Sequence, residues 1–509
     1  MKRFLAALLT GAMLCVTLLA GCGGSTSSAP AASTGSGSAA APTDPKDMPL
    51  VRMFYPLMSV PADNSLIEEK LNELTTSKVG VRVELETVPY ASYNDQINLI
   101  LAGTEQYDIA MVMGANLASY IAKDALVGLN DLLDAYGQDT KTALGNYLEA
   151  GAVDGEVYAL SAIRNMAAQQ GIALRKDLVE KYDIDLDAIK TEEDLTAVFE
   201  KVAAGEPDMY MVRPETSGNY GWLNCSLYDP LGDYIGMLGD QAQTLEVVNY
   251  PATEEYEKQC RLHRAWYQKG WVPNDLLTSS DSAWDLVAAG KLFGVTLTVK
   301  PGTAQEKTNS ANGVELVTVT YGEPLSYTSK ATGFSWAVLQ NTADAEAAMK
   351  VLNLLFTDPD FVNLIDWGVE GVHYQHVDGY DNVITFADGV DAASSGYFHS
   401  WNFAFGNQLL SWVWQGDDPD LWDQMREFND SAVISKAMGF TWDVTPVKTE
   451  FTAVNNVRTK YEMAITSGAM DYDETIDAYL KELEDAGIEK IIAEKQAQLD
   501  AWAAANGVS

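Results

Sequence analysis

The spacing of apolar positions predicts alternating strands and helices at the start of the ordered chain. The runs LVRMFYPL from Leu50 and VRVELETV from Val81 have strand-like composition, and YDIAMVM from Tyr107 has the apolar character of a buried strand. A helix is expected near residues 93–101. An earlier helical stripe consists of Leu66, Ile67, Leu71 and Leu74. Strands that alternate with helices are typical of a parallel α/β sheet.

The same kind of pattern returns later in the chain. The stretch VDGEVYALSAIRN contains a turn pair, Asp154-Gly155, followed by residues that suit a strand leaving the first unit. Residues 336–339 are expected to be extended, and a helix is expected after them. That helix carries the apolar stripe Ala348, Met349, Leu352 and Leu355. From Asp473 the chain is predicted to be helical with a break at Gly487, so the expected fold class is α/β with C-terminal helices.

The N-terminus has the pattern of a secretory signal peptide. Lys2 and Arg3 precede an apolar run over residues 4–20, which ends in small residues just before Cys22. The run is short for a stable bilayer span, which needs roughly 20 apolar residues. We expect residues 1–21 to be removed; an uncleaved signal anchor with an incidental cysteine is the alternative.

Residues 23–46, GGSTSSAPAASTGSGSAAAPTDPK, contain no large apolar side chain. Such a segment cannot bury a core and is predicted to be a flexible tether. A coil of this length has an end-to-end distance on the order of 25–30 Å. We therefore expect residues 22–47 to hold a folded body clear of a membrane.

Composition limits the partners. The 509 residues carry a formal net charge of −39, and removal of residues 1–21 takes away two basic residues and no acidic one, which makes the charge −41. A protein this acidic is not expected to bind nucleic acid, and anionic ligands are disfavoured as well. With 47% hydrophobic residues, the chain is long enough for two or more cores.

The four cysteines do not form a disulfide framework. Cys15 lies in the signal segment and Cys22 at its end, which leaves Cys225 and Cys260 for the folded part. A bridge between these two and a pair of separate, small apolar side chains both remain open.

Several stretches together resemble the extracellular solute-binding proteins of bacterial ABC transporters, of the family-1 type that binds sugars. YDIAMV, LVGLNDLLDAYG, VDGEVYAL and AAGKLFGV follow one another in the order that such proteins use. LNLLFTDPDFVNLIDWGVEGVHY and GFTWDVTPVKTEF resemble a subgroup of large lipoproteins with an uncharacterised C-terminal domain. Leu19-Ala20-Gly21-Cys22 is similar to the lipobox, in which the cysteine is lipidated with diacylglycerol after cleavage.

The resemblance implies a two-lobed, periplasmic-binding-protein-like fold with a hinge, in which the ligand lies between the lobes. The chain is expected to cross near residues 158–162, return near 328–336 and cross again near Trp367. The implied boundaries place residues 48–158 and 328–368 in lobe 1, residues 159–327 and 369–445 in lobe 2, and residues 446–509 in a C-terminal helical region.

A sugar ligand requires aromatic rings beside hydrogen-bonding groups, because sugars have both C–H faces and hydroxyl rims. All twelve tryptophans lie beyond residue 221. The stretches ETSGNYGWLN and SSGYFHSWNFAFGNQ combine aromatic and polar residues, and Trp336 and DWGVEG lie near expected crossings. The candidate ligand-binding residues from these stretches are Glu215, Asn219, Tyr220, Trp222, Trp336, Trp367, Glu370, Tyr397 and Trp401. For each single aromatic residue, ordinary core packing is the alternative.

Two further candidates come from the expected positions of strand ends. Asn116 follows the YDIAMVM strand, and open α/β sheets bind ligands at the carboxyl ends of their strands. Arg164 follows the crossing strand together with Asn165 and could offer a fork of donors to hydroxyl groups. A surface salt bridge is the alternative role for Arg164.

Metal and catalytic sites have weaker support. His373 and His376 lack further ligands nearby, and an EF-hand-like spacing in DIDLDAIKTEED has Ala188 in place of the required glycine and Asp194 in place of glutamate. The acids there are equally those of a helix start. No P-loop, Gly-x-Ser-x-Gly elbow or HExxH motif is present, and carboxylate pairs carry no specificity among 72 acids. We expect no cofactor, no metal and no enzymatic activity.

The sequence thus predicts a substrate-binding protein, lipid-anchored through Cys22 on the outer face of the cell membrane, that captures a neutral sugar or oligosaccharide. Its expected partners are the permease subunits of an ABC importer, and it is expected to be a monomer. A receptor for peptides or other small solutes is one alternative. A secreted glycosidase and a purely structural surface protein are alternatives of other classes.

Overall fold

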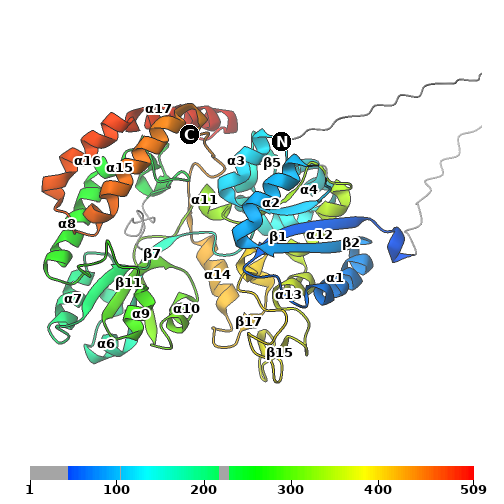
Figure 1. Ribbon diagram of the computed structural model, residues 1–509, viewed down its shortest axis with the longest axis horizontal. Coiled ribbons are helices and arrows are strands. Elements are labelled where there is room, and N and C mark those ends of the chain that lie inside the picture. The colour runs from blue at the N-terminus through cyan, green and yellow to red at the C-terminus, as the bar shows by residue number, and fades with distance from the viewer. Residues whose placement is uncertain (1–43, 104, 217–227) are drawn as a thin grey trace, which may run out of the picture. The chain divides into compact units, whose positions relative to one another are not determined.

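Two β-sheets, each flanked by helices, organise the chain (Figure 1). The computed structural model describes residues 44–103, 105–216 and 228–509. Within these described residues, no helix has both the length and the apolar character that a membrane crossing requires.

The first sheet has the strand order β2-β1-β3-β14-β6. Its strands are β1 (Leu50–Leu57), β2 (Arg82–Pro89), β3 (Ile109–Val112), β14 (Ser335–Val338) and β6 (Leu160–Ser161). The first three run parallel, as their alternation with helices requires, and β14 and β6 add antiparallel pairs. The strands predicted from Leu50, Val81, Tyr107 and Trp336 are therefore confirmed.

Helices cover this sheet because their apolar stripes face it. They include α1 (Asn64–Val79), α2 (Tyr90–Ala102), α3 (Gly114–Ala122), α12 (Ala345–Thr357) and α13 (Pro359–Trp367). In α1 the buried side chains are Ile67, Leu71 and Thr75, spaced one turn apart, and the helix ends at Gly80, whose φ of 68° favours glycine. The result is the core of the first lobe, in which Met53, Trp336 and their neighbours are fully buried.

The second sheet has the order β12-β7-β11-β8 and builds the second lobe. Its strands are β7 (Gln169–Arg175), β8 (Tyr210–Pro214), β11 (Leu292–Val299) and β12 (Leu316–Thr320). The helices around it include α7 (Leu195–Ala203), α8 (Glu254–Gln268), α9 (Ala283–Ala288) and α10 (Thr303–Ser310). Its two faces have hydrophobic cores of their own, separate from that of the first lobe.

Three segments connect the lobes and are paired with one another. Ala168, just before β7, forms an antiparallel bridge to Leu325 in β13 (Leu325–Ser326). β13 pairs in parallel with β18 (Val433–Ile434), so that Leu325 lies opposite Val433. The hinge is therefore a narrow three-segment ribbon, whose third member lies far beyond Trp367.

The expectation that the chain leaves the first lobe near Trp367 is wrong. Tyr397, Trp401, Ala404 and Phe405 belong to the core of the first lobe, although the boundary at 369 placed them in lobe 2. A small sheet contains β15 (Tyr374–His376) and β16 (Val383–Phe386), which precede this returning segment, and β17 (Val413–Trp414), which follows it. The end of the helix at Gly368 favoured a lobe boundary there, because no local sequence feature marks a loop that returns to the same core.

The C-terminal helices form a bundle against α8. They are α15 (Lys448–Thr466), α16 (Tyr472–Ala486) and α17 (Ile488–Asn506). The predicted break at Gly487 is confirmed, and its φ of 98° explains why glycine stands there. Lys495 of α17 is fully buried and donates hydrogen bonds from Nζ to Asp233 Oδ1 (2.9 Å) and to the carbonyl of Ile235 (2.6 Å), which fixes that segment to the bundle.

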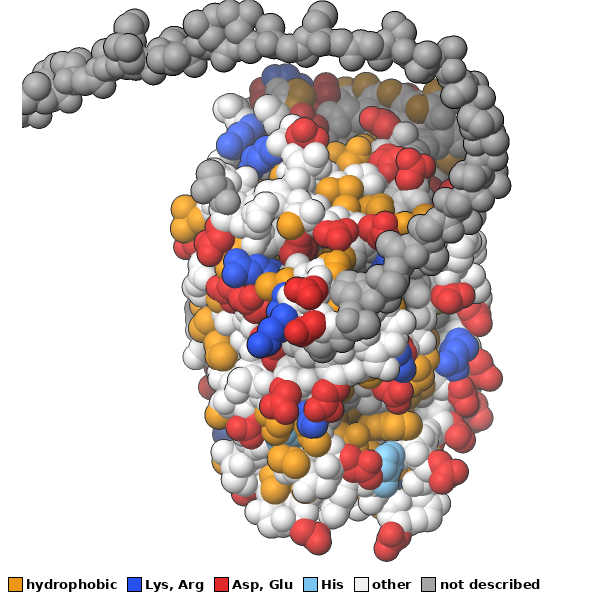
Figure 2. All heavy atoms as spheres, turned by 90° about the vertical axis from the view of Figure 1, so that its right-hand side faces the viewer, with side chains coloured by type: hydrophobic (Ala, Val, Ile, Leu, Met, Phe, Trp, Pro, Cys, Tyr) orange, Lys and Arg blue, Asp and Glu red, His pale blue; other side chains and the backbone are white. Residues whose placement is uncertain are grey.

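The surface reflects the acidic composition. Figure 2 shows the side of the molecule on which the first sheet lies in Figure 1, with acidic side chains spread over it and fewer basic ones among them. The basic side chains in the described chain are mostly held in ion pairs, such as Lys78 with Asp358 and Asp360. The excess of acid therefore surrounds the protein with a negative field.

Candidate ligand-binding site

The carboxyl edge of the first sheet gathers polar and aromatic side chains. β1, β2 and β3 all end there, and antiparallel β14 begins there, since Ser335 lies opposite Val112. Tyr90 follows β2 directly, Asn116 follows β3, and Phe334 precedes β14. Ligands of open α/β sheets bind outside this edge, because loops from several strands converge there.

Arg164 projects from the segment that leaves this edge for the second lobe. Its guanidinium carbon lies 5.5 Å from the ring centre of Phe334 and 5.9 Å from that of Phe403, within the range of cation–π attraction. Nη1 donates to Asn165 Oδ1 (3.0 Å), while Nε is buried and has no acceptor in the described protein. Burial lowers the pKa of Arg164 to about 10, so the side chain stays charged at neutral pH.

The backbone of Arg164 is also held firmly. Asn429 of α14 (Leu421–Asp430) donates from Nδ2 to the Arg164 carbonyl (2.6 Å), and its Oδ1 accepts from the Met166 N–H (2.8 Å). Ile163 donates to the Gly406 carbonyl at 2.7 Å. These bonds fix the position from which the guanidinium reaches the sheet edge.

Two aromatic rings, those of Phe334 and Phe403, contact Arg164, and two further rings extend the series away from it. Trp401 lies 5.6 Å from Phe334, 5.7 Å from Phe403 and 5.1 Å from Tyr90, measured between ring centres. We call Arg164, Tyr90, Phe334, Trp401 and Phe403 the aromatic edge. Trp401 is only 7% exposed, whereas Tyr90 is 42% exposed, so the aromatic edge runs from a buried centre to an open end.

A cavity of about 580 Å³ opens beside Arg164, and we call it the central cavity. Its lining includes Asn165, Ser400, Phe403 and Gln408 from the first lobe and its loops. Residues of the second lobe and of the segment that leads to the hinge complete the lining: Lys300, Pro301, Gly302, Glu306, Asn309, Asp417, Leu421, Trp422 and Met425. The volume lies within the range of small-molecule sites.

Trp422, which also lines this cavity, carries a second buried donor. Its Nε1 is buried and has no acceptor among the residues that the structure describes. Buried donors in native proteins are nearly always hydrogen-bonded, so Trp422 Nε1 and Arg164 Nε are two donors that lack the usual acceptor in the described protein. Asp417 supplies an acceptor on the same wall, and burial raises the pKa of its carboxyl.

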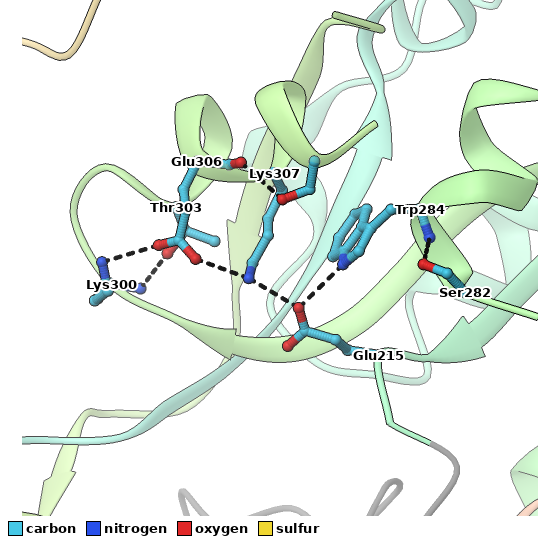
Figure 3. Close-up of polar contacts among 8 residues, drawn as sticks. Glu215, Ser282, Trp284, Lys300, Thr303, Glu306 and Lys307 are labelled. Carbon is cyan, nitrogen blue, oxygen red and sulfur yellow. Dashed lines mark hydrogen bonds and ion pairs between the residues drawn. The ribbon is translucent and has the colours of Figure 1, made fainter. Parts of the chain in front are cut away.

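The second lobe faces the central cavity with paired charges, shown in Figure 3. Lys300 Nζ lies 3.2 Å from Glu306, and Lys307 Nζ lies 2.8 Å from both Glu306 and Glu215. Trp284 Nε1 donates to Glu215 Oε1 at 3.2 Å. We call Glu215, Lys300, Glu306 and Lys307 the charge-paired edge. Its two cations and two carboxylates balance.

Each charge in this chain stabilises the next. Burial alone would raise the pKa of Glu306, but Lys300 and Lys307 lower it below its usual value. Burial alone would lower the pKa of Lys307, yet Glu215 and Glu306 raise it. Glu306 and Lys307 are therefore both ionised at neutral pH, and Lys300 and Glu306 reach the cavity as a matched pair.

Comparison with known proteins identifies the family. The family model described as bacterial extracellular solute-binding protein matches residues 60–360, and a model for a domain of unknown function matches residues 436–504. The chain belongs to the bacterial extracellular solute-binding proteins. Its two-lobed α/β fold with C-terminal helices, expected from the sequence, is confirmed.

Curated and solved relatives extend over most of this solute-binding protein. It is 25% identical over 464 residues to a carbohydrate ABC transporter substrate-binding protein of Streptococcus pneumoniae, covering 90% of this chain and 91% of the relative. Lipoprotein LipO of Bacillus subtilis is 25% identical over 354 residues, covering 65% and 68%.

Solved structures show the same fold. The N-glycan transport solute-binding protein NgtS of Streptococcus pneumoniae matches with a TM-score of 0.78 at 23% identity, covering 89% of this chain and 99% of that one. An ABC-transporter-associated solute-binding protein from Bifidobacterium longum infantis, described as HMO binding, matches with a TM-score of 0.63 at 16% identity, covering 89% and 99%.

Four of the expected site residues lie at the two edges of this solute-binding protein. Arg164 and Trp401 belong to the aromatic edge, Asn116 lies at the same sheet edge, and Glu215 belongs to the charge-paired edge. Asn219, Tyr220 and Trp222 lie outside the described residues, as do Cys22 and Cys225. Cys260 is a buried free cysteine.

Trp336 and Tyr397 are core residues, contrary to the expectation from the sequence. Trp336 has no exposed surface, and its Nε1 donates to the Ala404 carbonyl at 2.8 Å. Tyr397 is also buried, and its hydroxyl donates to the Ile365 carbonyl at 2.7 Å. Their polar tips are satisfied inside the core, so neither side chain is free to contact a ligand.

Trp367 and Glu370 lie away from the central cavity. Trp367 stacks on Trp414, with ring centres 5.2 Å apart, and its Nε1 donates to Ser411 Oγ at 2.8 Å. Glu370 is exposed and lines a different cavity, of about 520 Å³, together with Tyr374 and Trp412. The structure does not bring these two residues together with Arg164.

The acids with EF-hand-like spacing shape local turns. Asp185 Oδ1 accepts the Asp187 N–H at 3.1 Å, and Asp194 Oδ2 accepts the N–H groups of Lys190 (3.0 Å) and Thr191 (2.8 Å). These bonds lower the pKa of Asp194. Across residues 44–103, 105–216 and 228–509, no group of three or more His, Cys, Asp or Glu side chains has the arrangement of a metal site.

Other residues of the two edges and the cavity carry weaker signals in the sequence. Phe403 and Gln408 belong to the stretch SSGYFHSWNFAFGNQ, whose earlier aromatic residues, Tyr397 and Trp401, are the predicted candidates. Tyr90 follows a predicted strand, the same signal that selected Asn116. Trp422 lies on a helix, where aromatic residues ordinarily face a core, and Lys300 gains its role only from the fold.

Proposed function

We propose that this protein is the substrate-binding subunit of an ABC importer and that it captures a neutral oligosaccharide in the central cavity. The observation that carries the proposal is the pairing of aromatic rings with unused donors around one cavity. Phe403 and Trp422 supply aromatic rings for the C–H face of a sugar. Arg164 Nε and Trp422 Nε1 have no acceptor in the described protein, and we propose that sugar oxygens accept hydrogen bonds from them. Gln408 and Asn165 add amides beside them.

The preference for a neutral ligand follows from charge. The charge-paired edge presents Lys300 and Glu306 in equal number, so it offers hydrogen bonds without a net charge. The protein as a whole carries −39, a field that repels anionic ligands over distances of about a Debye length. Hydroxyl groups donate and accept, and therefore match both members of the pair.

The relatives support the choice of carbohydrate. One is named a carbohydrate ABC transporter substrate-binding protein, and the crystal structures of NgtS include complexes with Man1GlcNAc and Man5GlcNAc. Capture would follow from the two edges: a ligand that contacts both stabilises the state in which they are close, and the hinge ribbon permits that change. The bound protein, a monomer, would then deliver the sugar to the permease, and the importer's other subunits would supply the energy. No catalytic role is proposed.

A lipid anchor completes the proposal. Cys22 would carry the diacylglycerol after cleavage of residues 1–21, and residues 22–47 would tether the body to the outer face of the cell membrane. Replacement of Cys22 by serine should release the protein into the medium and abolish labelling by radioactive palmitate. Retention of label and membrane attachment in that variant would refute the anchor.

The sugar assignment is tested by a binding screen. We expect that a panel of neutral oligosaccharides, which includes Man5GlcNAc, raises the melting temperature of the purified protein, with a dissociation constant in the micromolar range or below and a stoichiometry of one. Peptides of similar size should have no effect. A panel without any stabilising glycan would refute the assignment, and release of reducing sugar during incubation would point to a glycosidase instead.

A further inference from the structure

Tyr90 is an exposed aromatic residue at the edge where a ligand is expected. Its side chain is 42% exposed, and it begins α2 directly after the end of β2. A single exposed aromatic side chain is ordinary on a protein surface. The surroundings of Tyr90 differ from such a case because they connect it to the central cavity.

The connection is a continuous series of ring contacts. Arg164 and Phe403 line the central cavity, and the guanidinium carbon of Arg164 lies 5.9 Å from the ring centre of Phe403. The ring centre of Phe403 lies 5.7 Å from that of Trp401, which in turn lies 5.1 Å from that of Tyr90. Tyr90 is therefore two ring contacts away from the cavity, across a nearly buried tryptophan that holds both neighbours in place.

Two amide side chains stand beside Tyr90. Asn94 lies one turn later on α2, so the two side chains share a face of that helix. Asn116 of α3 donates from Nδ2 to Asn94 Oδ1 at 3.2 Å, and this bond leaves the Nδ2 group of Asn94 and Oδ1 of Asn116 without a partner among the described residues. An aromatic ring beside a donor and an acceptor is the combination that one sugar residue requires.

We propose that Tyr90, Asn94 and Asn116 form an outer subsite, which holds a sugar residue of the same glycan whose other end occupies the central cavity. The proposal rests on the proposed function and makes it more specific, because it requires a ligand long enough to pass over Trp401. A glycan that fills only the cavity does not reach Tyr90. Affinity therefore depends on glycan length through this subsite.

The test compares a short and a long glycan in the full-length protein by isothermal titration calorimetry. Man1GlcNAc and Man5GlcNAc serve as probes. Wild-type protein should bind Man5GlcNAc more tightly. Tyr90→Ala should weaken the binding of Man5GlcNAc roughly 5- to 10-fold and change that of Man1GlcNAc less than about 2-fold, since one aromatic contact contributes on the order of 1 kcal/mol.

Conservative and distant variants separate stacking from folding. Tyr90→Phe keeps the ring and should retain wild-type binding of Man5GlcNAc within about 2-fold, and Asn94→Ala should lose about 3-fold for Man5GlcNAc alone. Tyr380→Ala is the matched control, because Tyr380 is 50% exposed and lies in the turn between β15 and β16. It should alter neither affinity.

The outcomes distinguish the two proposals. Equal affinity of wild-type protein for both glycans, or equal losses for both in Tyr90→Ala, would overturn the outer subsite while leaving the sugar-binding cavity in place. An unchanged length preference in Tyr90→Ala would overturn it as well. Failure of wild-type protein to bind either glycan would overturn the subsite as stated, and the broader panel then decides the proposed function separately.

Discussion

The two edges that meet at the central cavity differ in their chemistry, because one is mainly aromatic and the other consists of ion pairs. The aromatic edge of the first lobe places one cation, Arg164, against Phe334 and Phe403, with no carboxylate paired to it among the described residues. The charge-paired edge of the second lobe neutralises every charge with a neighbour. For the proposed ligand, we therefore expect the first lobe to supply most of the affinity and the second lobe to supply hydrogen bonds that form on closure.

The largest expected effect follows from removing the cation of the aromatic edge. Arg164→Ala should weaken glycan binding roughly a hundredfold, because it removes a charged donor and the group that spans two rings. Titration calorimetry with the best glycan of the panel measures this loss. Arg426→Ala is the control, since Arg426 is exposed and pairs only with Asp423 three residues away. Equal affinity in Arg164→Ala and wild type would contradict the expectation that the first lobe supplies most of the affinity.

A smaller effect is expected from breaking the charge-paired edge. Lys307→Met removes the cation that Glu215 and Glu306 share, so their mutual repulsion should displace the pair at the cavity and weaken binding about tenfold. Lys350→Met removes a comparable lysine, which pairs with Glu346 and lies 4.9 Å from the ring centre of Tyr136. Binding by this control should match wild type. A larger loss in Lys307→Met than in Arg164→Ala would contradict the ranking of the lobes.

The pH dependence of binding should come from the second lobe. The pKa of Glu306 lies below its usual value of 4.5, so its ion pairs persist above that pH and are lost as the pH falls through the lowered pKa. Arg164, with a pKa of about 10, stays charged over the same range. We expect nearly constant affinity from pH 8 to about 5.5 and a few-fold loss near pH 4, measured by tryptophan fluorescence.

Two variants sharpen this prediction. In Lys307→Met the decline should begin at higher pH, because the pKa of Glu306 loses one of the cations that lower it. Asp417→Asn removes the other cavity carboxyl, whose pKa burial raises, and should leave the decline near pH 4 in place. A decline that disappears with Asp417→Asn would assign the dependence to that carboxyl instead.

The smallest effect on affinity is expected for a core tryptophan. Trp336→Phe removes the donor to the Ala404 carbonyl and leaves a space in the first core, which should lower the free energy of unfolding by about 1–3 kcal/mol. Affinity for the glycan should remain within about 2-fold, since the side chain has no exposed surface. Chemical denaturation and calorimetry on the same sample measure both quantities. A loss of affinity without a loss of stability would show that Trp336 contributes to ligand binding.

The regular elements could be predicted from the sequence because local periodicity determines them. The alternation from Leu50 to Val112 predicted three parallel strands, and their carboxyl ends correctly located Asn116 at the carboxyl edge of the sheet. Arg164 was found for a similar reason: it follows a strand that leaves the sheet. Positive-φ glycines such as Gly487 mark helix ends whatever the tertiary context.

The long-range relations could not be predicted in the same way. Whether an aromatic residue in a loop faces a core or a ligand depends on what the loop packs against, so Trp336 and Tyr397 were misplaced, and Trp401 is itself only 7% exposed at the border of the same core. The return of residues 397–405 to the first core depends on packing with α13 and β14, far earlier in the chain. The charge-paired edge joins Glu215 and Lys307 across 92 residues, a spacing without any sequence signature.

The most direct test of the central claim compares two indole N–H groups in one nuclear magnetic resonance experiment. Trp422 lines the central cavity and its Nε1 has no partner in the part of the chain that the structure describes, whereas Trp336 Nε1 donates to the Ala404 carbonyl. With ¹⁵N-labelled tryptophan and assignment by substitution, saturating Man5GlcNAc should shift the Trp422 signal and leave the Trp336 signal unchanged. Saturable binding that leaves Trp422 unchanged and shifts Trp336 would contradict the account.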